Sequence, residues 1–283
     1  MSSAQMTTHE KEVRQGQRFE FGKNWQRFLR VLNDDRIAEA EKSLQSMLEV
    51  DSLSGKSFLD VGSGSGLFSL AAMRLGAARV HSVDYDSQSV ACTRELKRRY
   101  FPDSGCWTIE EGSALDAAYL AGLGQFDIVY SWGVLHHTGK MWEALENVAS
   151  LVAHEGKLFI SIYNSQVYWT SVWTKVKRTY TRSSKIGKWM ISGFFSLLFV
   201  GRGLMKDLIF LKNPMRRYID KKKSRGMNTY TDWIDWIGGY PFETAKPEEV
   251  FYFYRDRGFS LDRLFTCGGG HGCNQFVFTK CAE

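Results

Sequence analysis

The chain of 283 residues is long enough for one α/β domain of about 160 to 180 residues together with an added segment. Hydrophobic residues make up 43% of it, which is ample for a sizeable core, and it holds no internal repeat or low-complexity stretch. Five cysteines form no evident disulfide framework, and the first residues lack the basic and apolar regions of a signal peptide. We therefore expect a reducing, cytoplasmic location rather than a disulfide-stapled secreted domain.

The net charge of +6 is unevenly distributed along the chain. Residues 175–225 hold fifteen Lys or Arg against two acids, Asp207 and Asp220, a net +13 that leaves −7 for the rest. A strongly basic segment inside an acidic chain calls for a partner or a structural explanation.

The order of expected elements indicates an α/β sheet. Residues 8–50 have helical periodicity, and short apolar runs then alternate with helical stretches up to residue 163. We expect strands near 57–61, 79–84, 106–110, 126–131 and 157–162, with helices near 66–76, 87–99 and 140–152. Strands joined by helical crossovers form a parallel sheet that binds ligands at the carboxyl ends of its strands.

The regular alternation ends at about residue 164. Residues 165–225 are aromatic, basic and helix-like, whereas residues 247–258 predict a last helix, followed by strands near 259–265 and 275–280. We therefore divide the chain into an N-terminal helical cover (1–50), a nucleoside-binding core (51–164), a helical insert (165–245) and a segment that completes the core (246–283).

A glycine-rich turn follows the first expected strand. Residues 58–69 read Phe-Leu-Asp-Val-Gly-Ser-Gly-Ser-Gly-Leu-Phe-Ser, and glycines let a backbone approach a ligand where a Cβ would collide. Asp84 ends the second strand, where a carboxylate suits two ribose hydroxyls. The turn matches neither the dinucleotide fingerprint nor a phosphate-binding loop, and Asp60 favours a cationic group over a pyrophosphate. The sequence thus predicts a nucleoside cofactor with a cationic part.

These residues resemble the first motif, Asp-x-Gly-x-Gly-x-Gly, of the class I methyltransferases that use S-adenosylmethionine. Residues 111–116, 126–137 and 156–163 are similar, in the same order, to the family's adenine-contacting segment, fourth strand and fifth strand. The resemblance implies a Rossmann-like α/β fold whose seven-stranded, mostly parallel sheet ends in an antiparallel hairpin. It also implies S-adenosylmethionine as the cofactor.

The resemblance further implies a set of cofactor contacts. Asp84 would accept the ribose hydroxyls, and Asp60 would face the methionine amino group or, alternatively, hold the turn. The other expected contacts lie in the turn, at strand ends and in the N-terminal helix, where core packing is the alternative: Phe21, Trp25, Gly62, Ser63, Gly64, Gly66, Tyr85, Ser113, Ala114, Ser131 and Trp132.

Four side chains from the expected carboxyl edge of the sheet are candidate general bases: His136, Tyr163, Asp235 and His271. The alternative for His136 and its neighbour His137 is that both imidazoles bond to nearby backbone. Cys267, His271 and Cys273 lack a fourth ligand and the paired spacing of a structural zinc site, so we expect no metal.

The insert allows three interpretations. Residues 189–211 hold twelve Leu, Ile, Phe or Val, but Arg202, Lys206 and Asp207 cost more at full bilayer depth than these residues gain, which excludes a transmembrane helix. Residues 185–212 suit a helix at a membrane surface, a lid over a lipophilic substrate, or an RNA-contacting surface. The aromatic and acidic residues of 225–243 suit a wall of the substrate pocket or an anchor for the insert.

We therefore expect a methyltransferase that acts on an oxygen of a small or lipophilic acceptor, with peripheral membrane contact through residues 185–212 as one option. The position of the insert, before the last helix, is similar to the O-methyltransferases of ubiquinone biosynthesis. The alternatives are an RNA methyltransferase that uses the basic insert and a cofactor-binding scaffold without catalysis. The sequence lacks the Asn/Asp-Pro-Pro-Phe/Tyr and Pro-Cys signatures of nucleic-acid methylation, which argues against RNA.

Overall fold

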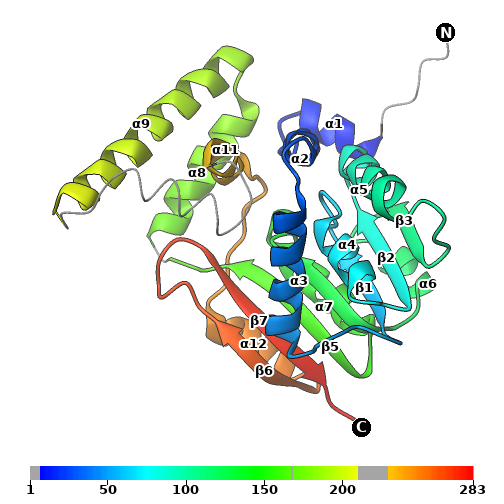
Figure 1. Ribbon diagram of the computed structural model, residues 1–283. Coiled ribbons are helices and arrows are strands. Elements are labelled where there is room, and N and C mark those ends of the chain that lie inside the picture. Colours follow the sequence, from blue (N-terminus) through cyan, green and yellow to red (C-terminus); the bar gives the residue numbers. More distant parts are fainter. Residues whose placement is uncertain (1–6, 167, 210–228, 283) are drawn as a thin grey trace.

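The computed structural model describes residues 7–166, 168–209 and 229–282. A seven-stranded sheet with the order β3-β2-β1-β4-β5-β7-β6 forms its centre (Figure 1). The strands are β1 (Ser57–Val61), β2 (Arg79–Asp84), β3 (Trp107–Glu111), β4 (Phe126–Trp132), β5 (Val152–Tyr163), β6 (Phe259–Phe265) and β7 (Cys273–Lys280). β1 to β5 pair in parallel, whereas β7 is antiparallel to both β5 and β6. The expected mostly parallel sheet with an antiparallel C-terminal hairpin is confirmed.

Helices cover both faces of the sheet, which explains why the central strands β1 and β4 are buried along almost their whole length. On one face lie α3 (Asp34–Leu48), α4 (Leu67–Arg74) and α5 (Ser87–Tyr100). On the other lie α6 (Ala117–Gly122), α7 (Met141–Ser150) and α12 (Pro247–Arg255). Because side chains alternate along a strand, Phe58 and Leu59 of β1 belong to two separate hydrophobic cores.

Two boundaries differ from the sequence prediction. β5 begins at Val152, earlier than expected, because Val152 already pairs with Phe126, ahead of an irregular stretch of β5 after which Lys157 pairs with Ile128. The helix α6 was not expected, since its six residues are too few to show a helical period. Asp116 starts it by accepting a hydrogen bond from the backbone N–H of Tyr119 at 3.0 Å.

The N-terminal helical stretch is divided into α1 (Thr8–Arg14), α2 (Gly22–Leu29) and α3. Gly16 interrupts it with a φ of 65°, and the Asn33 side chain caps α3 by accepting from the N–H of Arg36. Between α1 and α2, Arg18 donates to the His137 carbonyl after β4, and the N–H of Phe19 donates to the Tyr240 carbonyl.

The insert contains α8 (Trp169–Arg182), α9 (Lys185–Ile209) and α11 (Thr229–Gly238), grouped beyond the carboxyl end of β5 with α9 outermost (Figure 1). A third core of Phe19, Tyr180 and Ile237 attaches this group to the N-terminal segment. Within the described parts of the chain, no helix has the length and apolar character needed to cross a membrane. The basic run from 212 to 225 and the last residues of the expected interfacial helix lie outside the described residues.

Candidate active site

The glycine turn between β1 and α4 is fixed by crowding on all sides. Gly62, Gly64 and Gly66 have φ values of 82°, 57° and 80°, which L side chains rarely adopt. A Cβ on Gly62 would lie 2.3 Å from the Val134 side chain, and one on Gly64 would lie 2.9 Å from the Trp25 ring. Gly62 and Gly64 line the cavity described below, whereas Gly66 packs against Thr93 of α5 and does not line it.

Asp84 stands at the end of β2 with its carboxylate turned toward the glycine turn. Its Oδ2 accepts the N–H of Gly64 at 2.8 Å, and its Oδ1 accepts the N–H of Asp86 at 2.9 Å. Burial raises the pKa of Asp84 to about 7, against the opposing effect of these two hydrogen bonds. Each carboxylate oxygen keeps a second lone pair, so Asp84 has the acceptor capacity that two ribose hydroxyls need.

Asp60 ends a directed chain of hydrogen bonds through the sheet. The Trp107 Nε1–H donates to Ser82 Oγ at 2.8 Å, Ser82 and Ser69 hydroxyls lie 2.7 Å apart, and Ser69 Oγ–H donates to Asp60 Oδ2 at 2.5 Å. Burial raises the pKa of Asp60 to about 7, with the Ser69 hydrogen bond opposing that rise. The carboxylate therefore anchors α4 to β1 while it also lines the cavity, so both expected roles suit its position. Sequence reasoning missed Ser69 and Ser82, because a serine inside an apolar run carries no motif.

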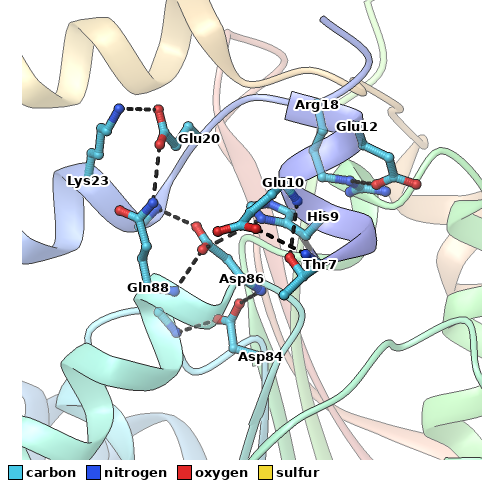
Figure 2. A network of polar contacts seen from close by, with 12 residues as sticks. Thr7, His9, Glu10, Glu12, Arg18, Glu20, Lys23, Asp84, Asp86 and Gln88 are labelled. Atoms are coloured by element: carbon cyan, nitrogen blue, oxygen red, sulfur yellow. Dashed lines mark hydrogen bonds and ion pairs between the residues drawn. The ribbon is translucent and has the colours of Figure 1, made fainter. Parts of the chain in front are cut away.

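Residues 9–25, which we call the strap, lie over the loops that follow the carboxyl ends of the strands. Asp86 Oδ2 accepts the N–H of Gly22 at 2.8 Å, and His9 Nδ1 lies 3.6 Å from Asp86 Oδ1 (Figure 2). Arg18 donates to the His137 carbonyl at 2.7 Å, and its Cζ lies 5.1 Å from the Tyr85 ring centroid. The strap thereby places Phe21 and Trp25 on the cavity wall.

A cavity of about 1800 Å³ extends from the glycine turn into the insert. At the insert it ends in an aromatic chamber, which we define by Tyr163, Trp169, Trp173, Trp236 and His271. The His271 ring centroid lies 5.8 Å from those of both Trp173 and Trp236, and 6.4 Å from that of Trp169. Phe199, Arg202 and Trp233 line the cavity next to this chamber.

Most of the expected cofactor contacts line this one cavity: Phe21, Trp25, Asp60, Gly62, Ser63, Gly64, Asp84, Tyr85, Ser113, Ala114 and Trp132. Ser131 does not, because its hydroxyl points into the sheet and donates to the Val61 carbonyl at 2.8 Å. Trp132, one residue on, lies at the wall and donates to Gln275 Oε1 at 3.2 Å. The binding roles of these residues remain predictions.

The four candidate bases are not all brought together. Tyr163 and His271 line the cavity, whereas His136 is fully buried outside its lining and accepts the N–H of Tyr163 on Nδ1 at 3.3 Å. The pKa of His136 lies well below the ordinary value of an imidazole, mainly because the ring is buried. Asp235 belongs to α11, but its side chain is outside the described part of the structure.

His137, and not the candidate base His136, occupies the cavity wall at this turn. It lines the cavity, and its Nδ1–H donates to the Pro241 carbonyl at 2.6 Å, which leaves Nε2 as a hydrogen-bond acceptor. Burial lowers the pKa of His137 to about 3, so the ring is neutral across the physiological range. Both imidazoles therefore contact backbone groups, as the alternative interpretation held.

His271 is the histidine of the chamber. Burial, followed by the charge of Arg202, lowers its pKa, so it is neutral at pH 7 and free to accept a proton. Among the residues that the structure describes, no group of three or more His, Cys, Asp or Glu is arranged to hold a metal ion.

Comparison with known proteins identifies the core. Residues 59–158 match a family model described as "Methyltransferase domain". The ribosomal protein L11 methyltransferase of Methylococcus capsulatus is 40% identical over 80 residues, which are 28% of this chain and 24% of that relative. The corresponding protein of Alteromonas mediterranea is 49% identical over 47 residues, 17% of this chain and 16% of the relative. The chain thus matches only about a quarter or less of the length of these curated relatives.

Solved structures share the fold over most of the chain. Magnesium protoporphyrin IX methyltransferase of Synechocystis PCC 6803, with bound SAH, has a TM-score of 0.51 at 14% identity, covering 99% of this chain and 90% of that one. An O-methyltransferase family protein of Burkholderia thailandensis scores 0.50 at 14% identity, covering 92% and 69%. The [4+2]-cyclase SpnF scores 0.52 at 11% identity, covering 86% and 80%. At these identities the likeness shows the fold alone.

The family match begins within β1 and ends within β5, so it includes the glycine turn, Asp60 and Asp84. The turn has no room for a Cβ at its three glycine positions, and Tyr130, which also lines the cavity, has a buried hydroxyl with no hydrogen-bond partner in the described structure. The residues present therefore fit a bound nucleoside cofactor. Residues 59–158 are therefore identified as a methyltransferase domain, and the chain around them shares the fold of a solved methyltransferase.

Proposed function

We propose that this protein transfers the methyl group of S-adenosylmethionine to an oxygen of a small, flat, lipophilic acceptor. The observation that carries this proposal is the single cavity joining the glycine turn to the aromatic chamber. Its volume of about 1800 Å³ exceeds the roughly 300–1,000 Å³ of ordinary small-molecule sites, which leaves room for an acceptor beside the donor.

The residues at the strand ends would hold the donor. Asp84 would bind the ribose hydroxyls, and the backbone at Gly62 and Gly64 would lie against the cofactor. When bound, S-adenosylmethionine supplies a methyl group already activated on a sulfonium. The main task of the protein is then to align the acceptor with that methyl group.

The aromatic chamber suits a flat acceptor for two reasons. Aromatic side chains prefer edge or offset contacts with another ring, which the Trp173 and Trp236 rings around His271 can offer. The buried Trp173 Nε1–H has no hydrogen-bond partner in the described structure, although it lines the cavity. A polar atom of the acceptor, such as a carbonyl or ether oxygen, would satisfy that donor.

We assign proton acceptance from the acceptor hydroxyl to His271. Its lowered pKa keeps the imidazole neutral at pH 7, and a phenol with a pKa near ~10 gains from a base as its oxygen is methylated. Arg202, whose charge contributes to that lowered pKa, would then stabilise the developing phenolate.

The test is transfer of labelled methyl from S-adenosylmethionine to a cell extract, followed by separation of lipid, small-molecule, protein and RNA fractions. We expect the label in the lipid or small-molecule fraction. Replacing Trp173 with Phe keeps the ring but removes the N–H, and should raise KM about five- to twentyfold with little change in kcat. Label confined to RNA or protein would refute the proposed acceptor class. Absence of transfer in every fraction, with cofactor binding intact, would favour a scaffold without catalysis.

A further inference from the structure

The outermost helix of the insert, α9, exposes an apolar stripe along its whole length. Residues three or four apart share one side of a helix, and the stripe follows that spacing through Ile186, Met190, Phe194, Leu197, Leu204 and Leu208. Leu197 and Leu208 are 73% and 76% exposed, and Trp189, beside the stripe, is 77% exposed. A monomeric protein in water rarely leaves so large a contiguous apolar surface uncovered.

The opposite side of α9 is already in use. Phe195 and Phe199 pack against Trp173 of α8, with ring centroids 5.5 and 6.5 Å apart, and Phe199 lies 5.6 Å from Trp233 of α11. The inner side thus forms part of the cavity wall, and in Figure 1 the outer side faces away from the sheet. Rotating the helix to bury the stripe would break the inner contacts, so no rearrangement of the described helices covers it.

The surroundings of the stripe are positively charged. The sequence contains no Asp or Glu between Glu155 and Asp207. The cations of α8 and α9 on or near the surface are Lys175, Arg178, Arg182, Lys185, Lys188 and Arg202. An apolar stripe with basic residues near it, and with no acid on α9 before Asp207, complements a surface that is apolar inside and negatively charged outside.

We propose that the outer side of α9 docks on an anionic lipid bilayer. The helix would lie in the plane of the headgroups, with its apolar stripe among the acyl chains and the flanking cations on the lipid phosphates. Because Phe199 and Arg202 of the same helix line the cavity, docking would bring the aromatic chamber next to the membrane. A lipophilic acceptor could then pass from bilayer to chamber with little exposure to water.

The experiment is sedimentation of the full chain with vesicles of phosphatidylcholine alone or mixed with phosphatidylglycerol. We expect binding to the mixed vesicles that weakens with salt. Phe194→Glu with Leu197→Glu should abolish it, whereas Tyr252→Glu, at an exposed aromatic residue of α12, should not. Changing Arg182, Lys185 and Lys188 together to Gln should weaken binding roughly a hundredfold, since each basic residue near such a surface contributes about fivefold.

Circular dichroism and affinity for S-adenosylhomocysteine would confirm that each variant is folded. These readouts need no acceptor, so the docking inference can fail while the proposed reaction stands. Equally, docking can be observed although the proposed acceptor class is wrong. Lack of binding at low salt, or equal binding by the Phe194→Glu, Leu197→Glu variant, would overturn it. So would a vesicle-independent dimer that the same variant dissociates, because a second copy would then cover the stripe. Binding of RNA without vesicle binding would also overturn it.

Discussion

Replacing Asp84 with Asn tests the donor site with the smallest change of shape. In the wild-type chain both carboxylate oxygens accept a backbone N–H, from Gly64 and from Asp86, at 2.8 and 2.9 Å. The amide has one oxygen, so one of these N–H groups would face an NH₂ and lose its acceptor. Leaving a buried N–H without an acceptor costs about 1–3 kcal/mol, and we expect the variant to be less stable by about that amount.

The loss of cofactor affinity adds to this effect. Hydrogen bonds from ribose hydroxyls to a charged acceptor are worth about 1.5–3 kcal/mol, so the Kd for S-adenosylhomocysteine should rise roughly ten- to a hundredfold. Isothermal titration calorimetry measures this directly. Glu111→Gln is a matched control, because Glu111 ends the neighbouring strand β3 but lies exposed and outside the cavity lining.

A deoxyribose analogue of S-adenosylhomocysteine separates ribose binding from a general distortion of the turn. It should bind the wild-type chain more weakly than the parent compound, yet bind the Asp84→Asn variant about as well as the parent does. This non-additivity is the signature of a direct contact in a double-mutant cycle. If the analogue and the variant instead lower the affinity independently, Asp84 does not contact the ribose and the assignment is wrong.

Three further predictions concern acidity, the turn and the base. Burial raises the pKa of Asp60 and Asp84 to about 7, above their unfolded values, so ionising them destabilises the empty fold as pH rises through 7. A bound cationic donor should favour the ionised carboxylates, so thermal stabilisation by S-adenosylmethionine should grow from pH 6 to 8. Calorimetry should show proton release on binding, and stabilisation that does not change with pH would contradict the prediction. Gly62→Ala should lower the midpoint of thermal unfolding and abolish detectable cofactor binding, since its Cβ would lie 2.3 Å from Val134, and wild-type affinity would contradict the crowding argument. His271→Gln should lower kcat about 10²–10⁴-fold with cofactor affinity unchanged, whereas the exposed control His154→Gln should leave kcat unchanged. Because the His271 pKa is lowered from 6.5, the wild-type rate should stay constant down to pH 6.5 and fall only at lower pH. A similar kcat for both histidine variants would remove His271 as the base.

The sheet and the donor half of the cavity were predictable because their physics is local. The glycine turn, Asp60 and Asp84 lie within one strand-helix-strand unit, and the chain direction fixes which edge of the sheet they share. The C-terminal hairpin followed from a resemblance and from two short apolar runs. The register of its strand β7 against β5, with Cys273 opposite Tyr163, could not be read from those runs alone.

The acceptor half was predictable only in outline, because it is assembled from distant segments. His271 reaches the chamber from the β6–β7 loop, Trp173 from α8 and Trp236 from α11, and no spacing in the sequence links them. Between His136 and His137, adjacent in a short 3₁₀ turn, the backbone decides which imidazole reaches the cavity. The sequence pattern does not show the direction in which each of these two side chains leaves the turn, so it could not exclude His136 as a candidate base.

The strap of residues 9–25 has a consequence for how two ligands would bind. Its Gly22 is held by Asp86 beside the donor site, and three residues earlier the N–H of Phe19 donates to the Tyr240 carbonyl at 2.8 Å, next to α11. A ligand that orders the strap through either contact pays the entropic cost for both, so the second ligand binds to a segment already in place. Donor and acceptor would then bind with positive cooperativity, and by thermodynamic reciprocity each would slow the escape of the other.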